Sequence, residues 1–349
     1  MATDSNATNK KKYISYFARF AVAAVALYLT FRGENTRQVG QVLMSIRPVF
    51  FIAAFAIYIV SQIIFVFRWY LLLSVQGIKI GFPVAIKLHF IGLFYNNCLP
   101  SSIGGDLLRA WYVTKHTEKR IEAALSVFVD RLVGLAGIAI MGFVSYLFIP
   151  HDENKQSFNF SAFDITGKII AYRWYFAGVL LLLILLVFII YLIPRGRNAL
   201  KRAVNWVQEH GLAILGRTRK AFGVYYNKKF ALVAALILTF ACQGVFILGM
   251  WLVGREIGVD TPFKYYLIFF PISWLIGALP VSIGGLGIME WWLKIAFSQV
   301  SAVAGENALA LALCQRILWI LASLPGAVIH LSGAHLPKDF FIDYKEPVN

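Results

Sequence analysis

Polar residues suited to binding an anion surround a Pro-Ser-Ser turn inside an apolar segment. In chain order they are Asn96, Asn97, Pro100, Ser102, Gly104, Gly105, Asp106 and Arg109. Glycines allow close backbone approach, and free amides at a helix N-terminus beside a guanidinium suit phosphate or carboxylate. Asp106 is placed to cap the following helix. Because it precedes Arg109 by three residues on one helical face, mutual pairing is the structural alternative to ligand binding.

The same pattern recurs 180 residues later in the chain. The residues Leu99, Pro100, Ser102, Ile103, Gly104 and Gly105 return as Leu279, Pro280, Ser282, Ile283, Gly284 and Gly285. Each copy precedes an apolar segment that carries a polar residue and an arginine, first Asp130 with Arg131 and then Gln315 with Arg316. Glu290 follows the second glycine pair much as Arg109 follows the first. These unlike charges could pair in one state of a two-state transporter.

Four ionisable residues, Asp130, Arg131, Glu290 and Arg316, lie in apolar segments. Such groups cost on the order of several kcal/mol in a membrane unless they are paired or hydrated. Internal salt bridges that only fix helix packing are the alternative to ligand binding. The single polar residues Gln62, His89 and Gln243 favour hydrogen bonds between helices. The run His151, Asp152 and Glu153 could bind a metal, but an exposed loop fits it better.

The elements that must position these residues are membrane-spanning helices. The chain has 59% hydrophobic and 14% charged residues and a mean hydropathy of +0.70, which excludes an ordinary soluble domain. Apolar runs predict an all-α integral membrane protein with six transmembrane helices, at residues 13–31, 49–67, 121–149, 172–193, 230–254 and 306–333. Segments 82–116 and 262–299 are broken by Pro and Gly, which predicts two re-entrant or broken helical hairpins.

These elements form two halves of a single membrane domain over residues 1–349. Residues 13–149 and 172–333 each comprise two spans, a hairpin and a third span, and this odd number of crossings predicts an inverted repeat. Loop 194–229 carries nine Lys and Arg residues against Glu209 alone, so the positive-inside rule predicts that it is cytoplasmic. Both termini then also face the cytoplasm, and loop 150–171 lies outside.

The net charge of +16 is spread between apolar segments. It therefore indicates topology signals and contacts with anionic lipids, and not nucleic-acid binding. Cys98, Cys242 and Cys314 lie in apolar stretches as packing residues, without metal-type spacing. The first apolar segment is not followed by a small-residue cleavage site, so we expect no cleaved signal peptide.

The ordered set of motifs resembles the lysylphosphatidylglycerol synthase transmembrane-region family, also called flippase-like domains. It comprises Asn97, Leu99, Pro100, Gly104, Asp106, Arg109, Asp130, Arg131, Pro280, Gly284, Glu290 and Arg316. The resemblance covers nearly the whole chain and implies a lipid-handling membrane domain. In bifunctional synthases that domain moves an aminoacylated phospholipid from the inner to the outer leaflet. This chain ends about sixteen residues after the last span, without a soluble transferase domain, so glycolipid and polyprenyl-linked substrates are also open.

We therefore expect a lipid translocator of the inner, cytoplasmic membrane that moves an anionic or aminoacylated phospholipid or a lipid-linked glycan precursor. The expected substrate-binding residues are Asn96, Asn97, Pro100, Ser102, Gly104, Gly105, Asp106, Arg109, Asp130, Arg131, Pro280, Ser282, Gly284, Gly285, Glu290 and Arg316. Catalytic residues, metals and cofactors are not expected. The alternatives are a membrane transferase acting on a lipid-linked substrate and a small-solute transporter. A homodimer and a lipid-modifying or glycosyltransferase partner enzyme stay open.

Overall fold

The computed structural model describes residues 21–99, 104–147, 223–225, 228–279, 282–300 and 303–333. The chain divides into two compact units, Met1–Asp152 with Val224–Asn349, and Glu153–Gly223. The second unit lies outside the described residues except for Gly223. The predicted span 172–193 and nearly all of the basic loop 194–229 fall there, and everything below concerns the first unit.

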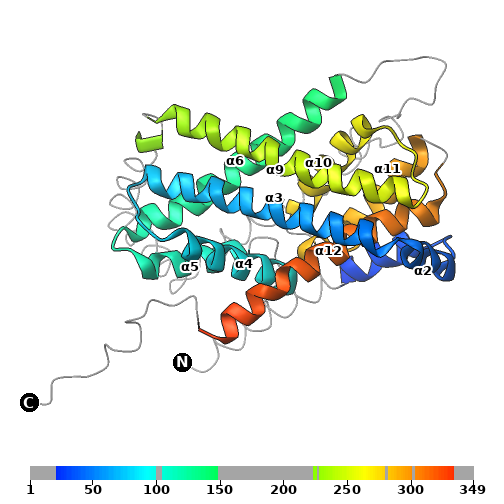
Figure 1. Ribbon diagram of the computed structural model, residues 1–349, viewed down its shortest axis with the longest axis horizontal. Helices are drawn as coiled ribbons and strands as arrows, with labels where there is room; N and C mark the ends of the chain where they lie inside the picture. Colours follow the sequence, from blue (N-terminus) through cyan, green and yellow to red (C-terminus); the bar gives the residue numbers. More distant parts are fainter. Residues whose placement is uncertain are drawn as a thin grey trace, which may run out of the picture. The chain divides into compact units, whose positions relative to one another are not determined.

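The described residues of this unit are helical, without a strand among them (Figure 1). Four helices are long and apolar enough to cross a membrane: α3 (Pro48–Val75), α6 (Arg120–Leu147), α9 (Lys229–Glu256) and α12 (Gly305–Leu331). They match four of the six predicted spans. A shorter apolar helix, Ala21–Phe31, covers the described part of the predicted span 13–31.

Both predicted hairpins are present as helices separated by a break. The first comprises α4 (Phe82–Cys98) and α5 (Gly104–Val113), followed by the short helix η1 (Thr114–His116). The second comprises α10 (Phe263–Ala278), the short helix η3 (Ile283–Gly285) and α11 (Ile288–Val300). A further helix, α2 (Thr36–Ser45), was not expected. Its first turn is capped by Asn35, whose side-chain oxygen accepts hydrogen bonds from the Arg37 and Gln38 amides.

The long helices α3 and α9 pack against each other along their length and run in opposite directions (Figure 1). Arg47, before the start of α3, pairs with Glu256 at the end of α9 through a 2.5 Å Nε to Oε1 contact. At the other end, the Tyr225 hydroxyl donates to the Leu72 carbonyl. Gly249 brings the two backbones close, because a Cβ there would lie 3.0 Å from Ile57. Small residues at helix crossings are typical of membrane proteins.

Each hairpin also packs against the final long helix of the other predicted half. Helix α4 lies against α12, and α10 lies against α6. The contact of α4 with α12 is close, since a Cβ on Gly326 would collide with the carbonyl group of Phe90. In the most apolar stretch of α12, 61% of the residues are buried, against 22–33% in the corresponding stretches of the three other long helices. Helix α12 is therefore the most central of the four.

Candidate functional site

The break in the first hairpin is shaped by a contact between two glycines. Gly105 lies so close to α4 that a Cβ there would collide with the Gly92 carbonyl oxygen. The Gly105 amide donates a 2.9 Å hydrogen bond to the Asn96 side-chain oxygen. Asn96 thus satisfies a free amide at the start of α5, the role that the sequence suggested for Asp106. Asp106 lies instead in the first turn of α5, and its carboxylate faces arginines.

Asp130 on α6 is fully buried between two arginines. Its Oδ1 accepts from Arg68 Nε and its Oδ2 from Arg109 Nη2, both at 2.9 Å. Arg68 also donates to the Thr239 hydroxyl on α9 at 2.8 Å. This network joins α3, α5, α6 and α9. Asp130 therefore forms the internal salt bridges that the sequence analysis gave as the alternative to ligand binding. These ion pairs compensate charges that would be costly to bury alone.

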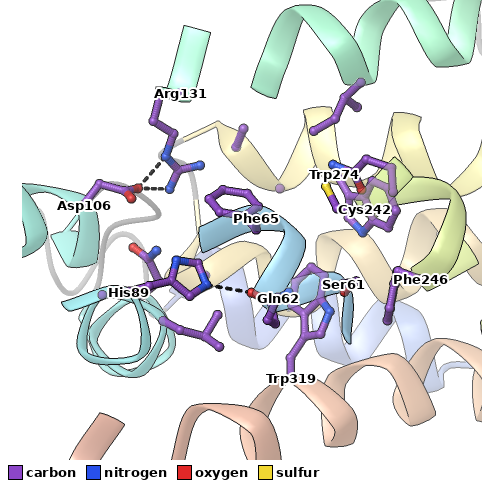
Figure 2. Close-up of a pocket in the computed structure, with 18 of the residues that line it drawn as sticks. Ser61, Gln62, Phe65, His89, Asp106, Arg131, Cys242, Phe246, Trp274 and Trp319 are labelled. Atoms are coloured by element: carbon purple, nitrogen blue, oxygen red, sulfur yellow. Dashed lines mark hydrogen bonds and ion pairs between the residues drawn. The ribbon is translucent and has the colours of Figure 1, made fainter. Parts of the chain in front are cut away.

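Asp106 and Arg131 form the more accessible part of the same network. Arg131 donates to the Asp106 carboxylate, whose other oxygen lies 3.4 Å from Arg109 Nη2 (Figure 2). The predicted pairing of Asp106 with Arg109 is thus present, but Arg131 is the nearer partner. The Arg131 side chain is 35% exposed, whereas that of Arg109 is 2% exposed. Arg131 is consequently the guanidinium of this network best placed to meet an arriving ligand.

The second hairpin holds its break with a different ion pair. Glu290 on α11 accepts from Arg316 Nε of α12 at 2.6 Å, and its other oxygen accepts from the Gly287 amide at 2.7 Å. Arg316 also donates to the Gly284 carbonyl at 2.9 Å. The residues Gly284, Gly285 and Gly287 all adopt positive φ, a conformation that side chains with a Cβ rarely adopt. Glu290 and Arg316 therefore hold the turn over residues 284–287 in place through hydrogen bonds to its backbone, and this turn requires glycine.

The breaks of the two hairpins meet. A Cβ on Gly284 would lie 3.1 Å from the carbonyl oxygen of Asn96. The anticipated pairing of Arg109 with Glu290 is not the arrangement here, because Arg109 binds Asp130 and Glu290 binds Arg316. Arg109 and Glu290 therefore each pair with a residue of their own predicted half.

A cavity of about 240 Å³ lies where the two hairpins meet. Figure 2 shows its two contrasting ends: Asp106, Arg131 and His89 lie together, whereas Trp274, Cys242 and Phe246 gather at the opposite side. Gln62 and Ser61 of α3 lie between these ends. Further lining residues from the sequence prediction are Asn96, Asn97, Arg109 and Gly284. The cavity is therefore amphipathic.

His89 and Gln62 join α4 to α3 through a 2.9 Å contact between His89 Nε2 and Gln62 Oε1. The contact fits the hydrogen bond between helices that the sequence favoured. Since Arg109 Nη1 donates to His89 Nδ1 at 3.5 Å, Nε2 carries the proton and donates to Gln62. Both residues also line the cavity.

Some of the predicted site residues are not brought to the cavity. Asp130, Glu290 and Arg316 lie behind it in ion pairs. Ser282 is fully buried before η3, and Gly104 and Gly105 shape the first break. Pro100, Ser102 and Pro280 lie outside the described residues. Within the described segments, His, Cys, Asp and Glu side chains do not gather in threes as metal ligands would.

Arg68 is a buried member of the charge network that sequence reasoning missed. The predicted span 49–67 ended one residue before it, whereas α3 continues to Val75. The available signal was the apolar run from Trp69 to Leu73 directly after the arginine. A charged residue with apolar sequence on both sides is a buried residue in need of a partner.

Comparison with known proteins finds relatives along most of the chain. The family model described as the lysylphosphatidylglycerol synthase TM region matches residues 16–326. A UPF0104 membrane protein of Methanothermobacter thermautotrophicus is 22% identical, with 91% of this chain and 95% of that protein covered. A UPF0104 membrane protein of Methanocaldococcus jannaschii is 24% identical, with 83% and 87% covered. The chain is a multi-pass membrane protein and belongs to the lysylphosphatidylglycerol synthase transmembrane-region family.

Proposed function

We propose that this protein moves a lipid between the leaflets of a membrane by alternating access. The candidate substrates are an anionic or aminoacylated phospholipid and a lipid-linked glycan precursor. The observation that carries the proposal is the amphipathic cavity between the two hairpin breaks, with Arg131 and Asp106 at one end and Trp274 and Phe246 at the other. A lipid matches this pattern, because its headgroup is polar and the first carbons of its tails are apolar.

The size of the cavity supports a headgroup as its occupant. Its volume of about 240 Å³ is below the roughly 300–1,000 Å³ of pockets that bury a drug-sized ligand. A lipid with two chains would not fit inside. Acyl chains would therefore stay in the bilayer while the headgroup crosses.

One face of α6 offers a route between the cavity and the bilayer. Arg131 and Leu135 line the cavity, whereas the neighbouring Phe128 and Leu132 are exposed on the same helix. Large exposed apolar side chains on a membrane helix are suited to contact with lipid tails. A headgroup bound at Arg131 would thus keep its tails against α6.

The pairing of helices supports the inverted repeat on which alternating access depends. Helix α4 of the first hairpin contacts α12, and α10 of the second hairpin contacts α6. The last helix of each predicted half therefore packs against the hairpin of the other half. The long helices α3 and α9 run in opposite directions. Two inverted halves give a transporter two states of similar energy that open to opposite sides. Six crossings, cytoplasmic termini and an inner-membrane location belong to this proposal.

The protein acts without covalent chemistry in this proposal. Asp106 and Asp130, the two carboxylates that could serve as bases in a transferase, are both held by arginines. A lipid-modifying or glycosyltransferase enzyme would supply the substrate, and a homodimer through the spans is compatible with this role.

The test is leaflet exchange by the purified protein in liposomes that contain fluorescent anionic or aminoacylated lipids. We expect wild-type protein to accelerate exchange and Arg131→Gln to lose most of the acceleration. Arg109→Ala removes the neighbouring guanidinium and serves as a second variant. The matched control is Arg37→Gln, because Arg37 is exposed on α2, far in sequence from both hairpins. Wild-type protein that is folded but moves no lipid would refute the proposal and favour the transferase or solute alternative.

A further inference from the structure

The carboxylates at the cavity and behind it, of which Asp106 alone lines it, limit what headgroup the cavity can bind. Asp130 uses one oxygen for Arg68 and the other for Arg109. Asp106 contacts Arg109 and Arg131 through its two oxygens, and Glu290 contacts Arg316 and the Gly287 amide. An ammonium group binds through acceptors such as these. A headgroup ammonium would therefore have to share its carboxylate with an arginine that already binds it, in a network where guanidinium groups outnumber carboxylates.

The charges at the polar end favour an anion. Three guanidinium groups, those of Arg68, Arg109 and Arg131, face the carboxylates of Asp106 and Asp130. Among the residues that the structure describes, the guanidinium groups of this network outnumber its carboxylates by one. In addition, Arg109 Nε is buried and has no hydrogen-bond partner in the described part of the chain. A phosphate oxygen would neutralise the charge and satisfy such a donor.

Apart from its charged residues, the cavity is lined by groups that bind hydroxyls. Gln62, Asn97, Gln243 and Ser61 all face it. An amide both donates and accepts, as a hydroxyl requires of its partner. Of these, Gln243 makes no side-chain hydrogen bond within the segments that the structure describes, so its amide is available to a ligand.

Two tryptophans also line the cavity: Trp274 of α10 at the end opposite Asp106, and Trp319 of α12 beside Gln62 (Figure 2). Trp274 is only 9% exposed, and its Nε1 has no hydrogen-bond partner among the described residues. Indole combines an apolar face with one donor, which suits the apolar C–H face and the hydroxyls of a sugar or cyclitol ring. Among the described residues, the cavity lining thus has two buried, unsatisfied donors of different character. Arg109 Nε carries a positive charge that suits a phosphate oxygen, and Trp274 Nε1 is neutral and suits a hydroxyl.

From these observations we infer that the cavity binds a phosphate-linked sugar or polyol headgroup without an amino group. The phosphate lies beside Arg109 and Arg131, and the hydroxyls lie toward Gln243 and Trp274. That the ligand is a lipid rests on the proposed function. The inference selects one class among the substrates that were proposed there. Aminoacylated phospholipids are excluded as the preferred substrate.

The test measures binding separately from transport. The full-length protein in detergent is titrated with phosphatidylinositol, lysyl-phosphatidylglycerol and phosphatidic acid, and the bound fraction is read by native mass spectrometry. Inositol 1-phosphate is titrated in parallel to distinguish a lipid from a soluble phosphate ester. We expect phosphatidylinositol to bind at least about tenfold more tightly than lysyl-phosphatidylglycerol.

A pair of variants tests the hydroxyl contacts. Gln243→Leu should weaken phosphatidylinositol binding by about tenfold, which is the effect of losing one or two hydrogen bonds. It should leave phosphatidic acid, which has no polyol, unchanged. Gln41→Leu is the matched control, since Gln41 is exposed on α2, and it should change neither affinity.

The possible results separate this inference from the proposed function. Equal or tighter binding of lysyl-phosphatidylglycerol would overturn the inference, whether or not leaflet exchange occurs. Selective binding of phosphatidylinositol without any leaflet exchange would support the headgroup class and refute translocation. Binding of inositol 1-phosphate alone would overturn the lipid assignment in favour of a solute.

Discussion

Arg68 and Asp130 are 62 residues apart in the chain and are joined by a 2.9 Å hydrogen bond between fully buried groups. Arg109 binds the second oxygen of the same carboxylate. The membrane-spanning helices α3 and α6 are therefore connected through a charge that neither could bury alone. Removing one partner from a buried pair leaves an uncompensated charge, which is more costly than replacing both.

We predict that Arg68→Ala lowers the free energy of unfolding by about 3–5 kcal/mol. Thermal or denaturant unfolding in detergent micelles, followed by tryptophan fluorescence, measures the change. Arg37→Ala is the control, because that arginine is exposed on α2. An Arg68→Ala protein that unfolds like wild type would show that Asp130 finds sufficient compensation from Arg109 alone.

The second prediction concerns the first hairpin break. Gly105→Ala places a Cβ against the Gly92 carbonyl, so α4 and α5 must separate, at a cost of about 1–3 kcal/mol. Gly244→Ala is the matched control, because a Cβ there meets no atom within 4 Å in the described structure. It should be neutral or slightly stabilising, as expected for alanine in a helix. Equal unfolding midpoints for the two variants would contradict the close approach at Gly105.

The third prediction concerns the ion pair of the second hairpin. Glu290→Ala leaves Arg316 buried beside the Gly284 turn, and we expect a clear loss of stability. Adding Arg316→Met removes the orphaned charge and should restore part of the loss. The coupling energy from the double-mutant cycle should fall in the range of about 0.5–3 kcal/mol that contacting residues show. Additive losses would indicate that the two side chains act independently.

The fourth prediction concerns topology. Single cysteines are introduced into loops 150–171 and 194–229 after the three native cysteines, Cys98, Cys242 and Cys314, are replaced by alanine. A membrane-impermeant maleimide applied to intact cells should label the first loop and leave the second unlabelled until the cells are opened. Labelling of both loops from outside would contradict the inverted repeat, because the span 172–193 must separate them.

The sequence predicted the two hairpins because Pro and paired Gly break apolar runs, and such breaks depend on local backbone chemistry. It also identified Asp106, Arg109 and Arg131, whose charges stand out in apolar surroundings. It did not identify Arg68, since the end of an apolar run is a poor guide to the end of a helix. The sequence also could not predict which charged side chains pair with one another. Whether Glu290 binds Arg109 or Arg316 depends on how helices pack, which periodicity does not contain.

The reciprocal packing of the halves has a consequence for biogenesis. Helix α4 enters the membrane long before the ribosome has made α12, against which α4 packs so closely at Gly326. Until then, the first hairpin has no neighbour for that face. The cavity, which Trp319 of α12 helps to line, is therefore completed only when the last helix inserts. A nascent chain stopped before that point would carry Asp106, Arg109 and Arg131 without the part of the cavity wall that Trp319 supplies.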